Sequence, residues 1–240
     1  VLLLKPDPAA LGWRPDGERM APGAPVTRPV GVPYADARRI WFFWAVTLGY
    51  VFLMAAQVGG IQQLVKLMEE RSGEGAATVV TSVLAGTSVV ARLIGGPIIS
   101  RLPMVKLTAI LGATQAVALA LLAELDSQAA LFGAIVLFGA TIGNILMLQP
   151  LLLAERFGVA DYPRIFSRSQ FIGVFGMAGG PYLLGRLHDW SNGYRTSYLV
   201  AAMLSLIGAA FVASGGSERF RLSEVPGDVR VVRPATVPAS

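Results

Sequence analysis

One arginine interrupts an apolar stretch of the sequence and is the residue best suited to bind a ligand. Arg92 is the only charged residue of 75–100. A cation is costly in hydrocarbon, so we expect this side chain to face a protein interior or a watery cavity. The planar guanidinium can pair with a carboxylate through two parallel hydrogen bonds. Arg92 therefore predicts an anion site, and a structural arginine that snorkels to a helix end is the alternative.

Uncharged polar side chains in the other apolar stretches could line the same cavity. Tyr50 and Gln57 lie in the first stretch, Asn144 in the fourth and Gln170 in the fifth. Each could bind a substrate or a neighbouring helix through hydrogen bonds. We group these four residues with Arg92 as candidate substrate-binding residues, and helix–helix contacts remain the alternative for each of the four.

The residue types needed for several other chemistries are scarce. The 240 residues include no Cys and one His, which argues against disulfides, thiolate metal sites and cysteine nucleophiles. The apolar stretches contain no metal-ligand cluster, no carboxylate pair and no nucleophile beside a base. We therefore expect no enzyme activity, no cofactor and no metal site.

The apolar stretches have the length of membrane-spanning helices. The chain is 54% hydrophobic and 15% charged, whereas soluble domains are about 25% charged. Residues 40–65, 127–154 and 196–217 carry no charge, and each run exceeds the roughly 18 residues that indicate a span. These features predict an all-α membrane protein in a lipid bilayer. The pI of about 9.9 is explained by basic loops, so no nucleic-acid partner is expected.

Six transmembrane helices are expected, near 39–64, 76–100, 105–123, 128–152, 165–187 and 196–215. Residues 1–37 are interpreted as a cytoplasmic loop, 38–216 as the transmembrane domain and 217–240 as a disordered cytoplasmic tail. Fifteen of the 20 Lys and Arg residues fall on one side and four on the other. This bias predicts that both termini are cytoplasmic, in an inner or plasma membrane. Because the chain begins with Val1, we expect a missing upstream part.

A repeated tripeptide suggests internal symmetry. Gly-Gly-Pro occurs at 95–97 and at 179–181, late in the second and fifth expected helices, and Arg-Leu follows each copy. These two helices would cross the membrane in opposite directions. The pattern predicts two inverted three-helix repeats, as transporters contain, and two unrelated helix kinks are the alternative.

Several segments together resemble the C-terminal half of a major facilitator superfamily transporter. Residues 8–17 (PAALGWRPDG) resemble the central cytoplasmic loop of many prokaryotic members. Residues 155–158 (ERFG) and 179–189 (GGPYLLGRLHD) resemble the region around the tenth and eleventh helices of that family. The resemblance implies a twelve-helix parent, of which this chain supplies six helices and a missing N-terminal six-helix half is the partner.

Within that superfamily, Val90, Ala91, Arg92 and Gly95 look like the eighth helix of the monocarboxylate and oxalate/formate carriers. The resemblance implies that Arg92 binds a substrate carboxylate, although Ser88 stands where many monocarboxylate carriers have an aspartate. The fifth helix has no Lys, only Arg164 and Arg168 at its entrance, which favours a monoanion over a dianion. Gly96 and Arg101 resemble the ends of the G-x-x-x-D-R gating loop, with Ser100 in place of the aspartate.

The resulting expectation is a secondary transporter of small organic anions, in particular monocarboxylates, that works by alternating access. Two alternatives remain open. One is a carrier or efflux pump for a neutral or hydrophobic molecule, with Arg92 structural. The other is a six-span membrane protein that does not transport.

Overall fold

The computed structural model describes residues 30–99 and 102–216, and the described part is helical apart from its connections and one isolated β-bridge. Arg101, the first 29 residues and the tail beyond Gly216 lie outside the described residues, so the interpretations of these segments stay predictions. The helices in chain order are α1 (Tyr34–Ala37), α2 (Trp41–Ser72), α3 (Glu74–Ile99), α4 (Met104–Glu124), α5 (Gln128–Phe157), α6 (Tyr162–Ser191) and α7 (Tyr194–Ser214).

The six long helices coincide with the six expected helices, but three run further than hydropathy alone indicated. α6 extends beyond the expected 165–187 at both ends, to Tyr162–Ser191. α2 continues to Ser72, and its last turn carries charged residues that face the end of the molecule. α5 continues to Phe157 and includes Pro150 within the helix. The apolar part of a span therefore sets its membrane-embedded length, while the helix itself extends to the next glycine, at Gly73 and Gly158.

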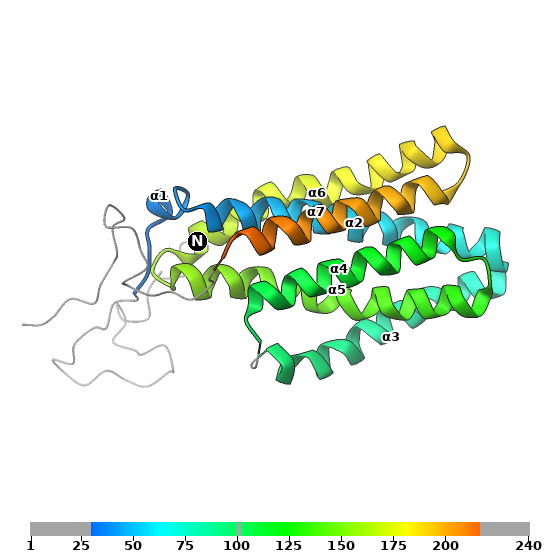
Figure 1. Cartoon of the computed structure of the whole chain (residues 1–240), viewed down its shortest axis with the longest axis horizontal. Coiled ribbons are helices and arrows are strands. Elements are labelled where there is room, and N and C mark those ends of the chain that lie inside the picture. Colours follow the sequence, from blue (N-terminus) through cyan, green and yellow to red (C-terminus); the bar gives the residue numbers. More distant parts are fainter. Residues whose placement is uncertain (1–29, 100–101, 217–240) are drawn as a thin grey trace, which may run out of the picture.

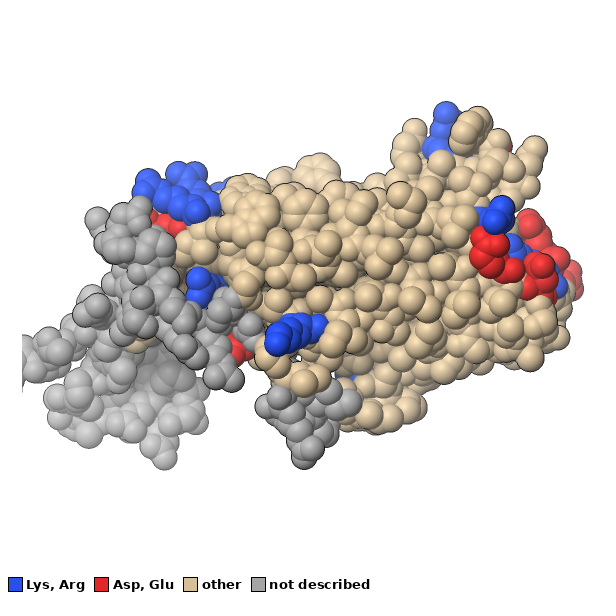
Figure 2. All heavy atoms as spheres, in the orientation of Figure 1, with Lys and Arg blue, Asp and Glu red and all other residues tan. Residues whose placement is uncertain are grey.

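Five of the described helices are long and apolar enough to cross a membrane, namely α2, the part of α3 from Glu74 to Gly96, α4, α5 and α7. α6 has comparable length but is less apolar, because it carries five glycines and three arginines. Figure 2 shows charged side chains gathered at the two ends of the visible face, with an uncharged belt between them. This distribution is that of an integral membrane protein.

The helices pack in a pattern that relates the first three long helices to the last three. α2 packs most extensively on α6 and α7, and α5 packs most extensively on α3 and α4. If α2, α3 and α4 are exchanged with α5, α6 and α7 in that order, the pairs α2–α6 and α2–α7 become α5–α3 and α5–α4. The set of main packing partners is therefore unchanged. α4 and α7, which correspond under the exchange, pack directly on each other. The main packing partners of the two groups therefore correspond, although α6 packs on α7 while its counterpart α3 makes few contacts with α4.

The segment before α2 is held against the loop that joins α5 and α6. Val32 N donates to Phe157 O at 2.8 Å, and Tyr34 N donates to an Asp161 carboxylate oxygen at 2.8 Å. Gly31 and Gly158 form an antiparallel bridge, in which Gly158 has the positive φ of 71°. The described end of the predicted 1–37 loop is therefore ordered, because backbone groups of the α5–α6 loop pair with it.

Candidate functional site

Arg92 lies on the exposed surface of α3, where it rests on a glycine of α5. A Cβ placed on Gly143 would be 2.7 Å from Arg92 Nε and 2.9 Å from Nη2, so the guanidinium occupies the space that a larger residue would fill. No described residue forms an ion pair with Arg92. The side chain is thus outside the interior of the six-helix bundle, contrary to one of the two placements expected.

The position of the guanidinium along the helices bears on both interpretations of Arg92. Gly143 is near the middle of the 30-residue helix α5, so each end of that helix is roughly 20 Å away at 1.5 Å per residue. An arginine that snorkels would place its charge near a helix end. The contact with Gly143 places the guanidinium beside the middle of α5, whereas Arg92 itself stands seven residues, about 10 Å, before the end of α3 at Ile99.

Asn144, the next residue along α5, joins α5 to α3. Its Nδ2 donates to Ala91 O at 3.2 Å and to Ala140 O at 3.1 Å. Its Oδ1 is buried, accepts no hydrogen bond from the described residues, and occupies the place where a side chain on Gly95 would project. Asn144 therefore positions α3 relative to α5, beside Arg92.

Tyr50 reaches the same turn of α5 from the opposite side. The Tyr50 side chain is fully buried, and its hydroxyl donates to Ile145 O at 2.8 Å. Three of the five candidate residues, Arg92, Asn144 and Tyr50, thus converge on Gly143 to Ile145 of α5. Tyr50 makes a helix–helix contact, which was the alternative considered for it, and it supports the site from behind.

The remaining candidates are not brought to this turn by any hydrogen bond. Gln57 is buried, and its Oε1 has no hydrogen-bond partner among the described residues. Gln170 is half-buried on α6. Gly96 is exposed, with open space where a Cβ would lie, and the structure does not describe its expected gating partner Arg101. The site that the structure supports is therefore smaller than the set expected from sequence.

Sequence reasoning missed how α3 approaches α5. Ala91 and Gly95 form a small-x-x-x-small pair that faces Asn144, and Gly143 receives the guanidinium. The spacing of Ala91 and Gly95 was a usable signal. No sequence pattern indicated that the Arg92 side chain of α3 would lie beside Asn144 of α5.

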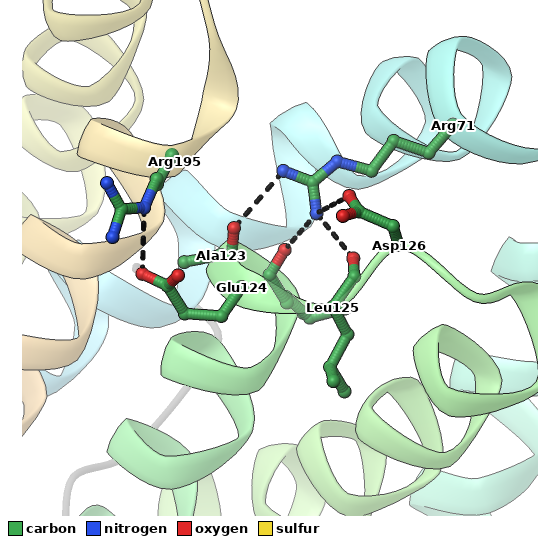
Figure 3. A network of polar contacts seen from close by, with 7 residues as sticks. Arg71, Ala123, Glu124, Leu125, Asp126 and Arg195 are labelled. Atoms are coloured by element: carbon green, nitrogen blue, oxygen red, sulfur yellow. Dashed lines mark hydrogen bonds and ion pairs between the residues drawn. The ribbon is translucent and has the colours of Figure 1, made fainter.

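A second polar cluster lies at the opposite end of the bundle and is structural (Figure 3). Arg71 donates to the carbonyl oxygens of Leu122 at 3.0 Å, Leu125 at 2.6 Å and Ala123 at 3.2 Å, at the end of α4. These carbonyls have no partner within the helix, and a cation there also interacts favourably with the helix dipole. Arg71 thus caps α4, and its Nη1 also lies 3.9 Å from an Asp126 carboxylate oxygen. Nor does any group of three His, Asp or Glu residues in the described ranges have the arrangement needed to hold a metal ion.

No family model matches the chain, and no curated protein is similar to it. The fold and the distribution of charge define the class: a helical protein with several helices able to cross a membrane.

Proposed function

We propose that this chain is the C-terminal half of a secondary transporter for small organic anions, in which Arg92 binds the substrate carboxylate. The observation that carries the proposal is the position of the Arg92 guanidinium, on Gly143 beside the middle of α5, without an acidic partner among the described residues. A cation without an acidic partner, between apolar helices, favours a site to which an anion brings the missing charge.

The surroundings of Arg92 favour a small substrate with one carboxylate. Arg92 is exposed on α3, so a ligand can reach it from outside the six-helix bundle. Ser88 Oγ lies 2.9 Å from the same Cβ position on Gly143, which places a hydroxyl one turn from the arginine and close to its guanidinium. One cation and neutral hydrogen-bonding groups complement a monoanion better than a dianion.

The proposal includes a partner of similar size. In a carrier built from two six-helix halves, the substrate binds between the halves and alternately faces each side of the membrane. The exposed position of Arg92 fits a site completed by another domain. The correspondence between the main packing partners of α2, α3 and α4 and those of α5, α6 and α7 supports this architecture. By the same reasoning, both termini are proposed to be cytoplasmic.

The test is uptake of labelled pyruvate, lactate, formate and oxalate by cells that express the natural reading frame containing these residues. We expect uptake of a monocarboxylate, and its loss by at least about tenfold in Arg92→Gln, since a hydrogen-bonded charge pair contributes about 1.5–3 kcal/mol. Arg92→Lys should retain part of the uptake, because it keeps the charge but not the planar fork.

Arg195→Gln is the matched control, because it removes an arginine from the other end of the bundle, where the side chain is exposed and pairs with Glu124. Its uptake should equal that of the unsubstituted protein. Unchanged uptake in Arg92→Gln at equal membrane abundance would overturn the role of Arg92. Transport of only neutral compounds would favour the drug-carrier alternative instead.

A further inference from the structure

A groove separates α3 from α4 and is floored by α5. Its volume is about 310 Å³, and its walls include Ala91 and Ile94 of α3, Leu107 and Leu111 of α4, and Ala140 and Asn144 of α5. α3 and α4 are consecutive helices, yet they make few contacts with each other. Except for Asn144 the walls are apolar. The groove is therefore suited to an apolar chain that takes the place of direct helix packing.

The lining residues place the groove along the first two turns of α4. Leu107 lies in the first turn of α4 and Leu111 one turn deeper, while Asn144 lies near the middle of α5. Ile94, which lines the groove, is 60% exposed, and Ile110, beside Leu111 on α4, is 57% exposed. The groove thus extends from the first turn of α4 to the turn of α5 that carries Asn144, and its rim is apolar and exposed.

A basic side chain lies at the shallow end. Lys106 is exposed in the first turn of α4, directly before Leu107, and forms no ion pair with a described residue. Its flexible stem can extend to the membrane surface. A lysine near the surface attracts anionic headgroups. The groove and the lysine together match the two parts of one anionic phospholipid.

We propose that an anionic phospholipid of the bilayer binds between α3 and α4, with an acyl chain in the groove and its phosphate on Lys106. This lipid fills the gap that the helices leave and so fixes the position of α3, the helix that carries Arg92. The proposal depends on the membrane-embedded fold and not on the transported substrate. A second groove of similar volume lies beside Trp41 and Ala210. It serves as a comparison, because the helices behind it, α2 and α7, pack directly on each other, whereas α3 and α4 do not.

Native mass spectrometry of the full chain, purified in detergent, tests the site with dioleoyl phosphatidylglycerol and dioleoyl phosphatidylcholine as probes. We expect one tightly bound lipid, with phosphatidylglycerol preferred about fivefold, the change that one basic residue near an anionic surface produces. Lys106→Gln should remove this preference while the weaker binding of phosphatidylcholine remains. Ala140→Leu, which fills the floor of the groove, should reduce the binding of both lipids.

Two matched variants locate the site. Arg39→Gln removes another exposed cation, and Ala210→Leu fills the comparison groove. Both should bind lipid as the unsubstituted chain does. Equal retention of the two lipids, an unchanged preference in Lys106→Gln, or loss of preference in Arg39→Gln would overturn the proposal. Lys106→Gln changes only an exposed side chain, so its result decides the question even where Ala140→Leu does not fold.

Discussion

The crossing of α6 over α2 and the crossing of α3 over α5 occupy corresponding places in the two groups of three helices, but they are packed differently. Gly176 and Gly180 of α6 lie against the backbone of Val51 and Ala55 of α2. At the α3–α5 crossing, the tip of the Arg92 side chain fills the space beside a glycine. Of the most apolar stretches, 72% is buried in α2 and 17% in α3.

The difference assigns separate tasks to the two crossings. Backbone-to-backbone contact leaves no flexible atoms that could move, so α2 and α6 form a fixed pair. The α3–α5 contact includes one backbone approach, where a Cβ on Gly139 would lie 3.0 Å from Leu84 O. At Gly143, however, it is made by the Arg92 side chain, which can adopt other rotamers. The proposed anion site thus lies at the α3–α5 crossing, where the Arg92 side chain can change its rotamer. A site that binds and releases a ligand needs such side-chain freedom.

Replacing a glycine of the α2–α6 crossing should produce the largest effect. In Gly180→Leu, a Cβ would contact the Ala55 Cα at 2.7 Å, and backbone atoms cannot move aside. We expect a loss of about 3 kcal/mol of stability, the upper part of the range for overpacking. Thermal unfolding in detergent, followed by size-exclusion chromatography, should show a midpoint lowered by roughly 10 °C.

Gly179→Leu is the control for this variant. Gly179 is adjacent in sequence, and a Cβ there would meet no atom within 4 Å. Its midpoint should change little. If both leucine variants unfold at the same temperature, the close contact with Ala55 does not limit stability and the two crossings are not distinct.

Removing the Arg71 cap should have an intermediate effect. Arg71→Gln loses the three hydrogen bonds to the end of α4, which together with the helix dipole we expect to be worth about 2 kcal/mol. Because the cap connects α2 to α4, the variant tests whether α4 belongs with the fixed helices. The unfolding midpoint should fall by about 4–8 °C.

Arg195→Gln provides the comparison at the same end of the molecule. The Arg195–Glu124 pair has a distance of 2.9 Å, but its side chains are 70% and 47% exposed. Exposed pairs contribute about 0–1 kcal/mol, so this variant should unfold close to the unsubstituted chain. A larger loss in Arg195→Gln than in Arg71→Gln would contradict the capping role.

The sequence predicted the helices well because their signal is local. Runs such as 127–154 exclude charge over the length of a span, and Gly73 and Gly158 end α2 and α5. α6 shows the limit of that signal, since its glycines lower its hydropathy while they allow its closest packing. Hydropathy and close approach are separate properties, and only the first can be read from composition.

The site was only partly predictable because it depends on which residues face each other across helices. Arg92 could be identified from its isolation, and Asn144 from its polarity. That Tyr50 would bond to Ile145 could not, because the partner is a backbone carbonyl, which every residue has. The two Gly-Gly-Pro segments also pack with a different register: Gly180 is the packed glycine in α6, and Gly95, the first of its pair, in α3.

Gly143→Ala should have the smallest effect on stability and thereby tests the adjustable crossing most directly. The added methyl would meet the end of the Arg92 side chain and the Ser88 hydroxyl, both of which can rotate away. Alanine also favours the helix by about 1 kcal/mol over glycine, so the unfolding midpoint should stay the same or rise slightly. Anion uptake should nevertheless fall severalfold, because the guanidinium is displaced from its place on α5.

Gly133→Ala, where a Cβ meets nothing within 4 Å, should leave uptake unchanged. A midpoint lowered as far as in Gly180→Leu would show that α3 is packed on α5 as rigidly as α6 is on α2. That result would remove the structural distinction on which the position of the anion site is argued.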